Sequence, residues 1–114
     1  AKPIIHNGRI ESEWRRGMTA LAKRDNVIAV KVSGMATEVT DDKIDEATLK
    51  NYFEESLDMF GPERLCFGTD WPVCLLRIDS YVRWADSVRA FVSELAPGEQ
   101  DAILYDTCAK AYRL

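Results

Sequence analysis

The chain has 114 residues, 46% hydrophobic and 30% charged, a composition typical of a globular domain with a modest core. A formal net charge of −4 argues against a nucleic-acid partner, because phosphate binding requires a basic surface. No apolar run approaches the roughly 20 residues that span a bilayer, and the first residues do not resemble a secretory signal. The three cysteines, Cys66, Cys74 and Cys108, have unrelated spacings and predict no disulfide framework. We therefore expect a cytoplasmic protein with no membrane or nucleic-acid partner.

The first half of the chain predicts a helix, a strand and a second helix. Residues 11–23 form an amphipathic pattern whose apolar side carries Trp14, Met18, Leu21 and Ala22. The β-rich run 27–33 predicts a strand that ends before Gly34. A polar loop separates this strand from a helix that we expect Asp45 to cap and Gly61-Pro62 to end.

The second half repeats this order and finishes in helices. Residues 64–69 predict a strand, and residues 71–79 predict a loop. The clearest helical stripe in the chain consists of Tyr81, Trp84, Ala85, Val88, Phe91, Val92 and Leu95. Pro97 opens a last helix that runs toward Tyr112. Such alternation indicates βαβ units and a parallel sheet. Because two strands are few for such a sheet, either the N-terminal segment adds a short strand or the chain is part of a larger barrel, and we favour the barrel.

Both predicted strands end in polar residues on one face. The bulky face of the first strand carries Ile28, Val30 and Val32, and we expect it to pack against helices. Its other face carries Lys31 and Ser33, and the small face of the second strand ends at Asp70. Active sites form where the carboxyl ends of barrel strands converge, so these three residues are candidates. A structural alternative stays open, in which Asp70 caps the loop that starts at Trp71-Pro72 and Lys31 is merely exposed.

Residues 67–73, Phe-Gly-Thr-Asp-Trp-Pro-Val, closely resemble the last-strand motif of the amidohydrolase family that contains sugar lactonases and 2-pyrone-4,6-dicarboxylate lactonase. Residues 30–34 are similar to that family's seventh strand, Ala1-Lys2-Pro3 to the end of its sixth, and residues 109–114 to its C-terminus. The resemblance covers the whole chain. It implies an α/β fold, the C-terminal fragment of a TIM-type (β/α)8 barrel with the last two strands and their flanking helices. We expect residues 1–114 to be the C-terminal part of a single amidohydrolase-like barrel domain.

The resemblance also implies roles for the residues at the strand ends. Asp70 matches the aspartate that acts as general base toward water and then protonates the leaving oxygen. In metal-dependent relatives this aspartate also binds the cation, so the resemblance leaves either one divalent metal such as zinc, with Asp70 as a ligand, or none. Lys31 and Ser33 are candidates for binding substrate, with an ion pair in the barrel interior as the equal alternative. Trp71 is a candidate for stacking on a sugar face or for closing the barrel rim.

Two other polar residues carry weaker signals. His6 is the only histidine, and it lies beyond the position of the family's sixth-strand histidine. We expect His6 to be an exposed loop residue without a catalytic role. Arg77 follows the last strand, and we expect it to be solvated rather than to bind an anionic substrate.

Together these observations predict a hydrolase that opens a sugar (aldono) lactone or a related lactone by aspartate-assisted attack of water. The partner is a small-molecule lactone or carboxylate, and a homo-oligomer is left open. The family's histidine motifs lie upstream of Ala1, so we expect the isolated chain to be inactive. Two alternatives remain: a metal-dependent decarboxylase of the same superfamily, or a truncated, non-catalytic fragment that self-associates through its strand edges.

Overall fold

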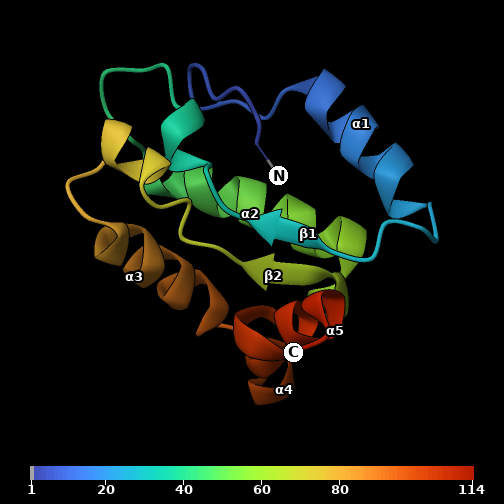
Figure 1. Cartoon of the computed structure of the whole chain (residues 1–114). Helices are drawn as coiled ribbons and strands as arrows, with labels where there is room; N and C mark the ends of the chain where they lie inside the picture. The colour runs from blue at the N-terminus through green and yellow to red at the C-terminus, as the bar shows by residue number, and fades with distance from the viewer. Residues whose placement is uncertain (1) are drawn as a thin grey trace.

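The computed structural model describes residues 2–114, and its helices and strands alternate along the chain (Figure 1). The helices are α1 (Ser12–Ala22), α2 (Glu46–Phe60), α3 (Tyr81–Val92), α4 (Pro97–Asp101) and α5 (Thr107–Tyr112). The strands are β1 (Val30–Val32) and β2 (Leu65–Phe67). Three 3-10 turns lie in the connections, η1 (Ala36–Glu38), η2 (Pro62–Arg64) and η3 (Val73–Leu76), and a π-helical segment, η4 (Ala102–Asp106), joins α4 to α5.

The two strands form a parallel sheet in which Lys31 lies opposite Cys66. This confirms the parallel pairing expected of a βαβ unit, in which α2 connects the strands. The N-terminal segment, as described from Lys2 onward, adds no third strand to this sheet. It makes a single parallel bridge between Ile5 and Val39, with the Ile5 N–H donating to the carbonyl of Glu38 over 3.0 Å.

Both strands are shorter than the predicted runs, 27–33 and 64–69. The N–H of Val27 donates across a turn to a preceding carbonyl over 3.2 Å, and Arg64 lies in η2, so neither residue joins the ladder. The expectation that Ile28 packs under a helix is wrong, because its side chain is 64% exposed. Ile28 precedes β1 and lies on the wall of a surface hollow instead.

The core lies between the sheet and helices α2 and α3, and Figure 1 shows α2 behind the strands. Its fully buried side chains include Val32, Leu65, Tyr52, Phe53 and Val88. Helix α1 packs beside α2, where the ring of Trp14 meets the ring of Tyr52 edge-on at 4.8 Å. Burial of each large apolar side chain contributes about 1.5–3 kcal/mol, which fixes the bulky face of the sheet toward these helices.

The caps predicted for α2 are confirmed. The carboxylate of Asp45 accepts from the Thr48 hydroxyl at 2.7 Å and from the Ala47 N–H at 3.2 Å. The bond from Thr48, with the backbone N–H bonds, lowers the pKa of Asp45. Helix α2 ends at Gly61, whose φ of +71° is the left-handed conformation that glycine adopts without strain. The chain then turns through η2 into β2.

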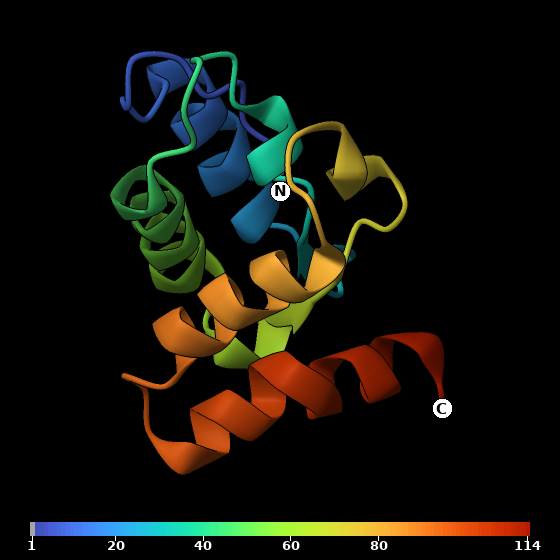
Figure 2. The same cartoon turned by 90° about the vertical axis from the view of Figure 1, so that its left-hand side faces the viewer.

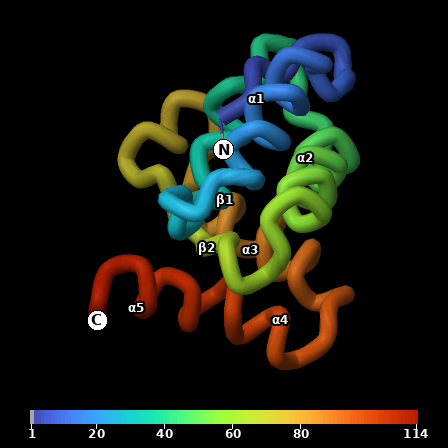
Figure 3. The backbone as a smooth tube through the Cα atoms, turned by 90° about the vertical axis from the view of Figure 1, so that its right-hand side faces the viewer, coloured from blue at the N-terminus to red at the C-terminus, as the bar shows by residue number. Residues whose placement is uncertain are grey.

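The C-terminal helices cover β2. Figure 2 shows α4, η4 and α5 as one continuous rod beneath α3, as the last predicted helix requires. Cys66 is buried there as a small hydrophobe, and burial raises the pKa of its thiol. Figure 3 shows α1 above the strands and the α4–α5 rod below them. Within residues 2–114, no helix has the length and apolar character that a membrane crossing needs.

Candidate functional site

Asp70 lies just beyond the carboxyl end of β2, at the start of the loop that leads to α3. Its φ of +57° is left-handed, a conformation that aspartate tolerates better than most residues. The loop is held by the Cys74 N–H, which donates to the backbone carbonyl of Asp70 over 2.9 Å, and by the Trp71 N–H, which donates to the Thr69 hydroxyl over 3.3 Å. Thr69, rather than the side chain of Asp70, therefore caps this loop, and the Asp70 carboxylate makes its contacts elsewhere.

The carboxylate of Asp70 is turned toward the loop after β1 and the start of the chain. Its Oδ2 accepts from the hydroxyl of Thr37 at 3.1 Å and lies 3.4 Å from Nζ of Lys2. The same ammonium lies 3.8 Å from Oε1 of Glu38. The Asp70 side chain is 15% exposed and that of Lys2 is 44% exposed. Both contacts fall on Oδ2, and no residue of the described chain donates to Oδ1.

Gly34 provides the space in which these groups meet. Its φ is +69°, and a Cβ at this position would stand 2.3 Å from Cε of Lys2 and 2.9 Å from Oδ2 of Asp70. The Thr37 hydroxyl also lies 2.8 Å from the carbonyl of Gly34. A hydroxyl has one proton, so Thr37 donates to Gly34 or to Asp70 at any one time.

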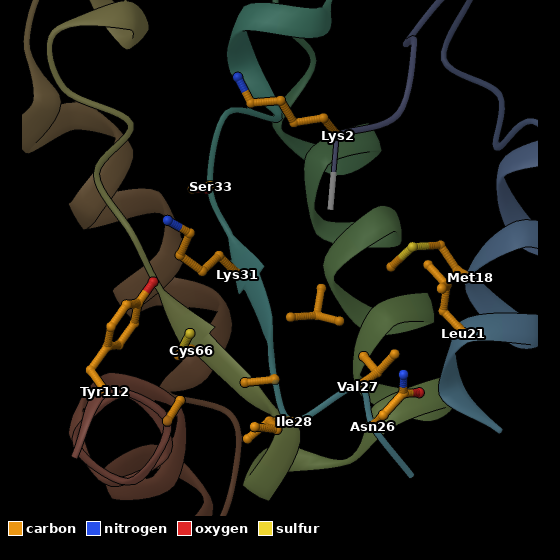
Figure 4. Close-up of a pocket in the computed structure, with 13 residues that line it drawn as sticks. Lys2, Met18, Leu21, Asn26, Val27, Ile28, Lys31, Ser33, Cys66 and Tyr112 are labelled. Carbon is orange, nitrogen blue, oxygen red and sulfur yellow. The ribbon is translucent and has the colours of Figure 1, made fainter. Parts of the chain in front are cut away.

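Lys31 and Ser33 line a hollow of about 740 Å³ beside β1 (Figure 4). Gly68 of the neighbouring chain segment leaves room for them, because a Cβ there would lie 3.1 Å from Cβ of Ser33 and 3.8 Å from Cδ of Lys31. Lys2 lines the same hollow, whereas Asp70 does not. The structure thus brings Lys31 and Ser33 together, and Lys2 belongs both to their hollow and to the surroundings of Asp70.

The remaining candidates lie on the outer loops. Trp71 follows Asp70, and its side chain is 63% exposed. Arg77 donates to the backbone carbonyl of Asp41, so its guanidinium has a protein partner as well as solvent. His6 is exposed, with Nδ1 lying 3.0 Å from the Thr40 hydroxyl and 3.3 Å from a carboxylate oxygen of Asp41. The exposure of His6 is confirmed, and its lack of a catalytic role stays a prediction.

Sequence reasoning misses Lys2 and Thr37 as partners of Asp70. They lie 68 and 33 positions away along the chain, so no local spacing links them to it. Two weaker signals exist. Lys2 falls in the run that resembles the end of a barrel strand, and Gly34 follows β1 at a position where a close approach of another group favours glycine.

A divalent metal requires more ligands than this part of the chain brings together. Zinc takes three or four protein ligands in its usual sites. Among residues 2–114, no group of three or more His, Cys, Asp or Glu side chains is placed to hold an ion. Asp70 alone offers one carboxylate, and an ammonium already lies beside its Oδ2. The described residues therefore do not themselves form a metal site.

Comparison with known proteins places the chain among amidohydrolases. A family model described as amidohydrolase matches residues 4–114. The chain is 36% identical to the L-fucono-1,5-lactonase of Burkholderia multivorans in an alignment of 113 residues, which covers 90% of this chain and 36% of that protein. It is 41% identical over 76 residues to the L-fucono-1,5-lactonase of Burkholderia ambifaria, with 67% of this chain and 25% of that protein covered.

A solved structure agrees with these sequences. The crystal structure of an amidohydrolase from Burkholderia multivorans with bound zinc superposes on this chain with a TM-score of 0.79 at 34% identity. The superposition covers 90% of this chain and 37% of that one. The matched part of the chain thus spans between a quarter and little more than a third of the length of these relatives.

Proposed function

The chain belongs to the amidohydrolase family, and on that premise we propose that the protein opens a sugar lactone by hydrolysis, with Asp70 as the general base. The reaction class rests on one observation, the similarity of almost the whole chain to a protein named L-fucono-1,5-lactonase. The role of Asp70 is supported by its place just beyond the carboxyl end of β2, with its carboxylate turned away from the loop that it begins.

We further infer that residues 1–114 form the C-terminal part of a (β/α)8 barrel domain. In that arrangement β1 and β2 are its last two strands, and the face of the sheet opposite α2 looks into the barrel. The hollow beside β1 has apolar walls from Met18 and Leu21 and polar ones from Lys31 and Ser33. The backbone groups at the exposed edge of β1 favour pairing with a preceding barrel strand. The apolar walls would then adjoin that strand, and the polar walls would adjoin the substrate.

The proposed reaction needs one proton acceptor that later becomes a donor. Asp70 takes a proton from water as the water oxygen attacks the lactone carbonyl. When the tetrahedral intermediate collapses, the ring carbon–oxygen bond breaks, and the leaving oxygen receives that proton from Asp70. The product is the open-chain hydroxy acid, and Asp70 returns to its ionised state. Lys31 and Ser33 would hydrogen-bond the sugar, and exposed Trp71 would stack on it.

Residues 1–114 alone are expected to show little or no turnover. Acyl transfer also requires a group that polarises the carbonyl, and removal of one such donor typically costs 10²–10³-fold in rate. The described residues place Asp70 near Lys2 and Thr37 but assign no donor to the carbonyl oxygen of a substrate. The proposed activity therefore belongs to the protein with its complete site.

The experiment follows acid release from a panel of sugar 1,5-lactones by the whole natural protein. Asp70→Asn keeps the shape of the side chain and removes the base, so hydrolysis should fall by about 10²–10⁴-fold. Asp58→Asn is the matched control, because Asp58 is exposed on α2 and should leave the rate unchanged. Failure of the wild type on every lactone would refute the reaction class. Equal rates for wild type and Asp70→Asn would refute the role of Asp70.

A further inference from the structure

Lys2 is the charged group that contacts the proposed base, and the proposed reaction does not yet use it. We propose that Lys2 is a positioning residue, whose ammonium holds Oδ2 of Asp70, together with the Thr37 hydroxyl, so that Oδ1 faces the reacting water. This inference rests on the proposed function of Asp70 as a base. It adds the residue that orients the carboxylate and the oxygen that takes the proton.

The first argument is the need for orientation. The terminal torsion of an aspartate side chain joins an sp³ to an sp² carbon, so its preference is broad and the carboxylate rotates easily. The left-handed backbone of Asp70 sets the direction of its Cα–Cβ bond but not this rotation. The Lys2 ammonium, 3.4 Å from Oδ2, restricts it, and the Thr37 hydroxyl at 3.1 Å adds to this whenever its proton points to Asp70 and not to Gly34. The other oxygen is then left for a substrate water.

The second argument is that the fold makes room for this contact. The Lys2 side chain crosses the position where any residue other than glycine at position 34 would carry Cβ. Lys2 reaches Asp70 from 68 residues away, and Glu38 at 3.8 Å helps to hold the ammonium at this point. A lysine that extended into solvent would not need a glycine at position 34 to make room for its side chain.

The third argument separates positioning from stability. The Lys2 side chain is 44% exposed, and ion pairs exposed to this degree contribute little to stability. A loss of kcat with KM and unfolding unchanged would therefore come from the contact of Lys2 with Asp70, and not from the fold or from the hollow that Lys2 also lines. Misplacement of a catalytic group by about 1 Å is enough to cost about 10²-fold in rate.

The test compares kcat, KM and the unfolding temperature of the whole protein for wild type, Lys2→Met, Lys2→Arg and Thr37→Val. We expect Lys2→Met to lower kcat by about 10–100-fold with KM and the unfolding temperature unchanged. Lys2→Arg keeps a cationic donor and should recover most of kcat. Thr37→Val should lower kcat less, because Thr37 shares its proton with Gly34. Lys23→Met is the control, because Lys23 is exposed at the end of α1.

Each pattern has one meaning. If Asp70→Asn abolishes hydrolysis while Lys2→Met and Thr37→Val keep the wild-type kcat, the positioning role is wrong and the proposed function stands. If Lys2→Met lowers both kcat and the unfolding temperature, and Lys2→Arg restores neither of them, Lys2 is structural and the inference is overturned. If Lys2→Met does not fold, the kcat of Thr37→Val decides. If the wild type hydrolyses no lactone, the proposed function fails, and the inference falls with it.

Discussion

The Cε atom of Lys2 lies where Gly34 would carry a side chain, only 2.3 Å from the Cβ that any other residue would place there. Gly34 also has a φ of +69°, in the left-handed region that costs a residue with a Cβ about 1–2 kcal/mol. Gly34→Ala is therefore expected to lower the free energy of unfolding by at least this amount and to displace Lys2 from Asp70. Urea unfolding measures the first effect, and kcat measures the second.

Gly17 provides the matched control for this substitution. It lies within α1, and a Cβ there meets nothing within 4 Å. Alanine favours a helix interior over glycine by about 1 kcal/mol, so Gly17→Ala should raise the free energy of unfolding. Opposite signs for the two variants are the expected result. If Gly34→Ala stabilises the protein instead, the Lys2 side chain moves aside freely. In that case neither its close approach nor the positive φ of residue 34 constrains the site.

Trp84 connects α3 to the end of β2. Trp84 is 2% exposed, and its Nε1–H donates to the carbonyl of Gly68 over 2.9 Å. Trp84→Phe removes the donor and leaves that carbonyl without its partner, so we expect a loss of about 1–2 kcal/mol in the free energy of unfolding. Trp71→Phe is the control, because Trp71 is 63% exposed, and its effect should stay within about 0.5 kcal/mol. Equal losses in the two variants would contradict this assignment.

Arg15 and Glu55 join α1 to α2 through two short hydrogen bonds, 2.6 and 2.9 Å long. The hydrogen bond and charge of Arg15 lower the pKa of Glu55 below its ordinary value of 4.5. A depressed folded-state pKa contributes stability at pH values above 4.5, and that contribution is lost as the pH falls through the folded-state pKa. Glu55→Gln should therefore lower the unfolding temperature at neutral pH and approach the wild type in acid.

The size of this effect is small, because both side chains are partly exposed. Added salt should reduce the difference at neutral pH, since screening weakens exposed charge pairs. Glu63→Gln, at an exposed position in η2, is the control and should show no comparable dependence on pH. A difference between wild type and Glu55→Gln that persists unchanged in acid would assign the effect to packing instead of charge.

The limits of α2 are predictable from the sequence because their signals are local. Asp45 caps α2 through bonds to residues two and three positions later, and Gly61 ends it through its own backbone conformation. The predicted strands are too long for the opposite reason. A strand extends only as far as a partner pairs with it, and the partner of β1 lies more than 30 residues away in the chain.

The alternation of residue types by itself determined that this chain forms parallel βαβ structure, with Asp70 just beyond a strand end, because periodicity and capping act over a few residues. The family resemblance in residues 67–73 is likewise a property of the amino-acid sequence alone. Only the tertiary structure decided which groups meet Asp70. Lys2 and Thr37 contact it from 68 and 33 residues away in the chain. Gly34 matters because the Lys2 side chain occupies the place where another residue would carry its Cβ. Such contacts depend on how helices and strands pack, and packing is a property of the whole fold.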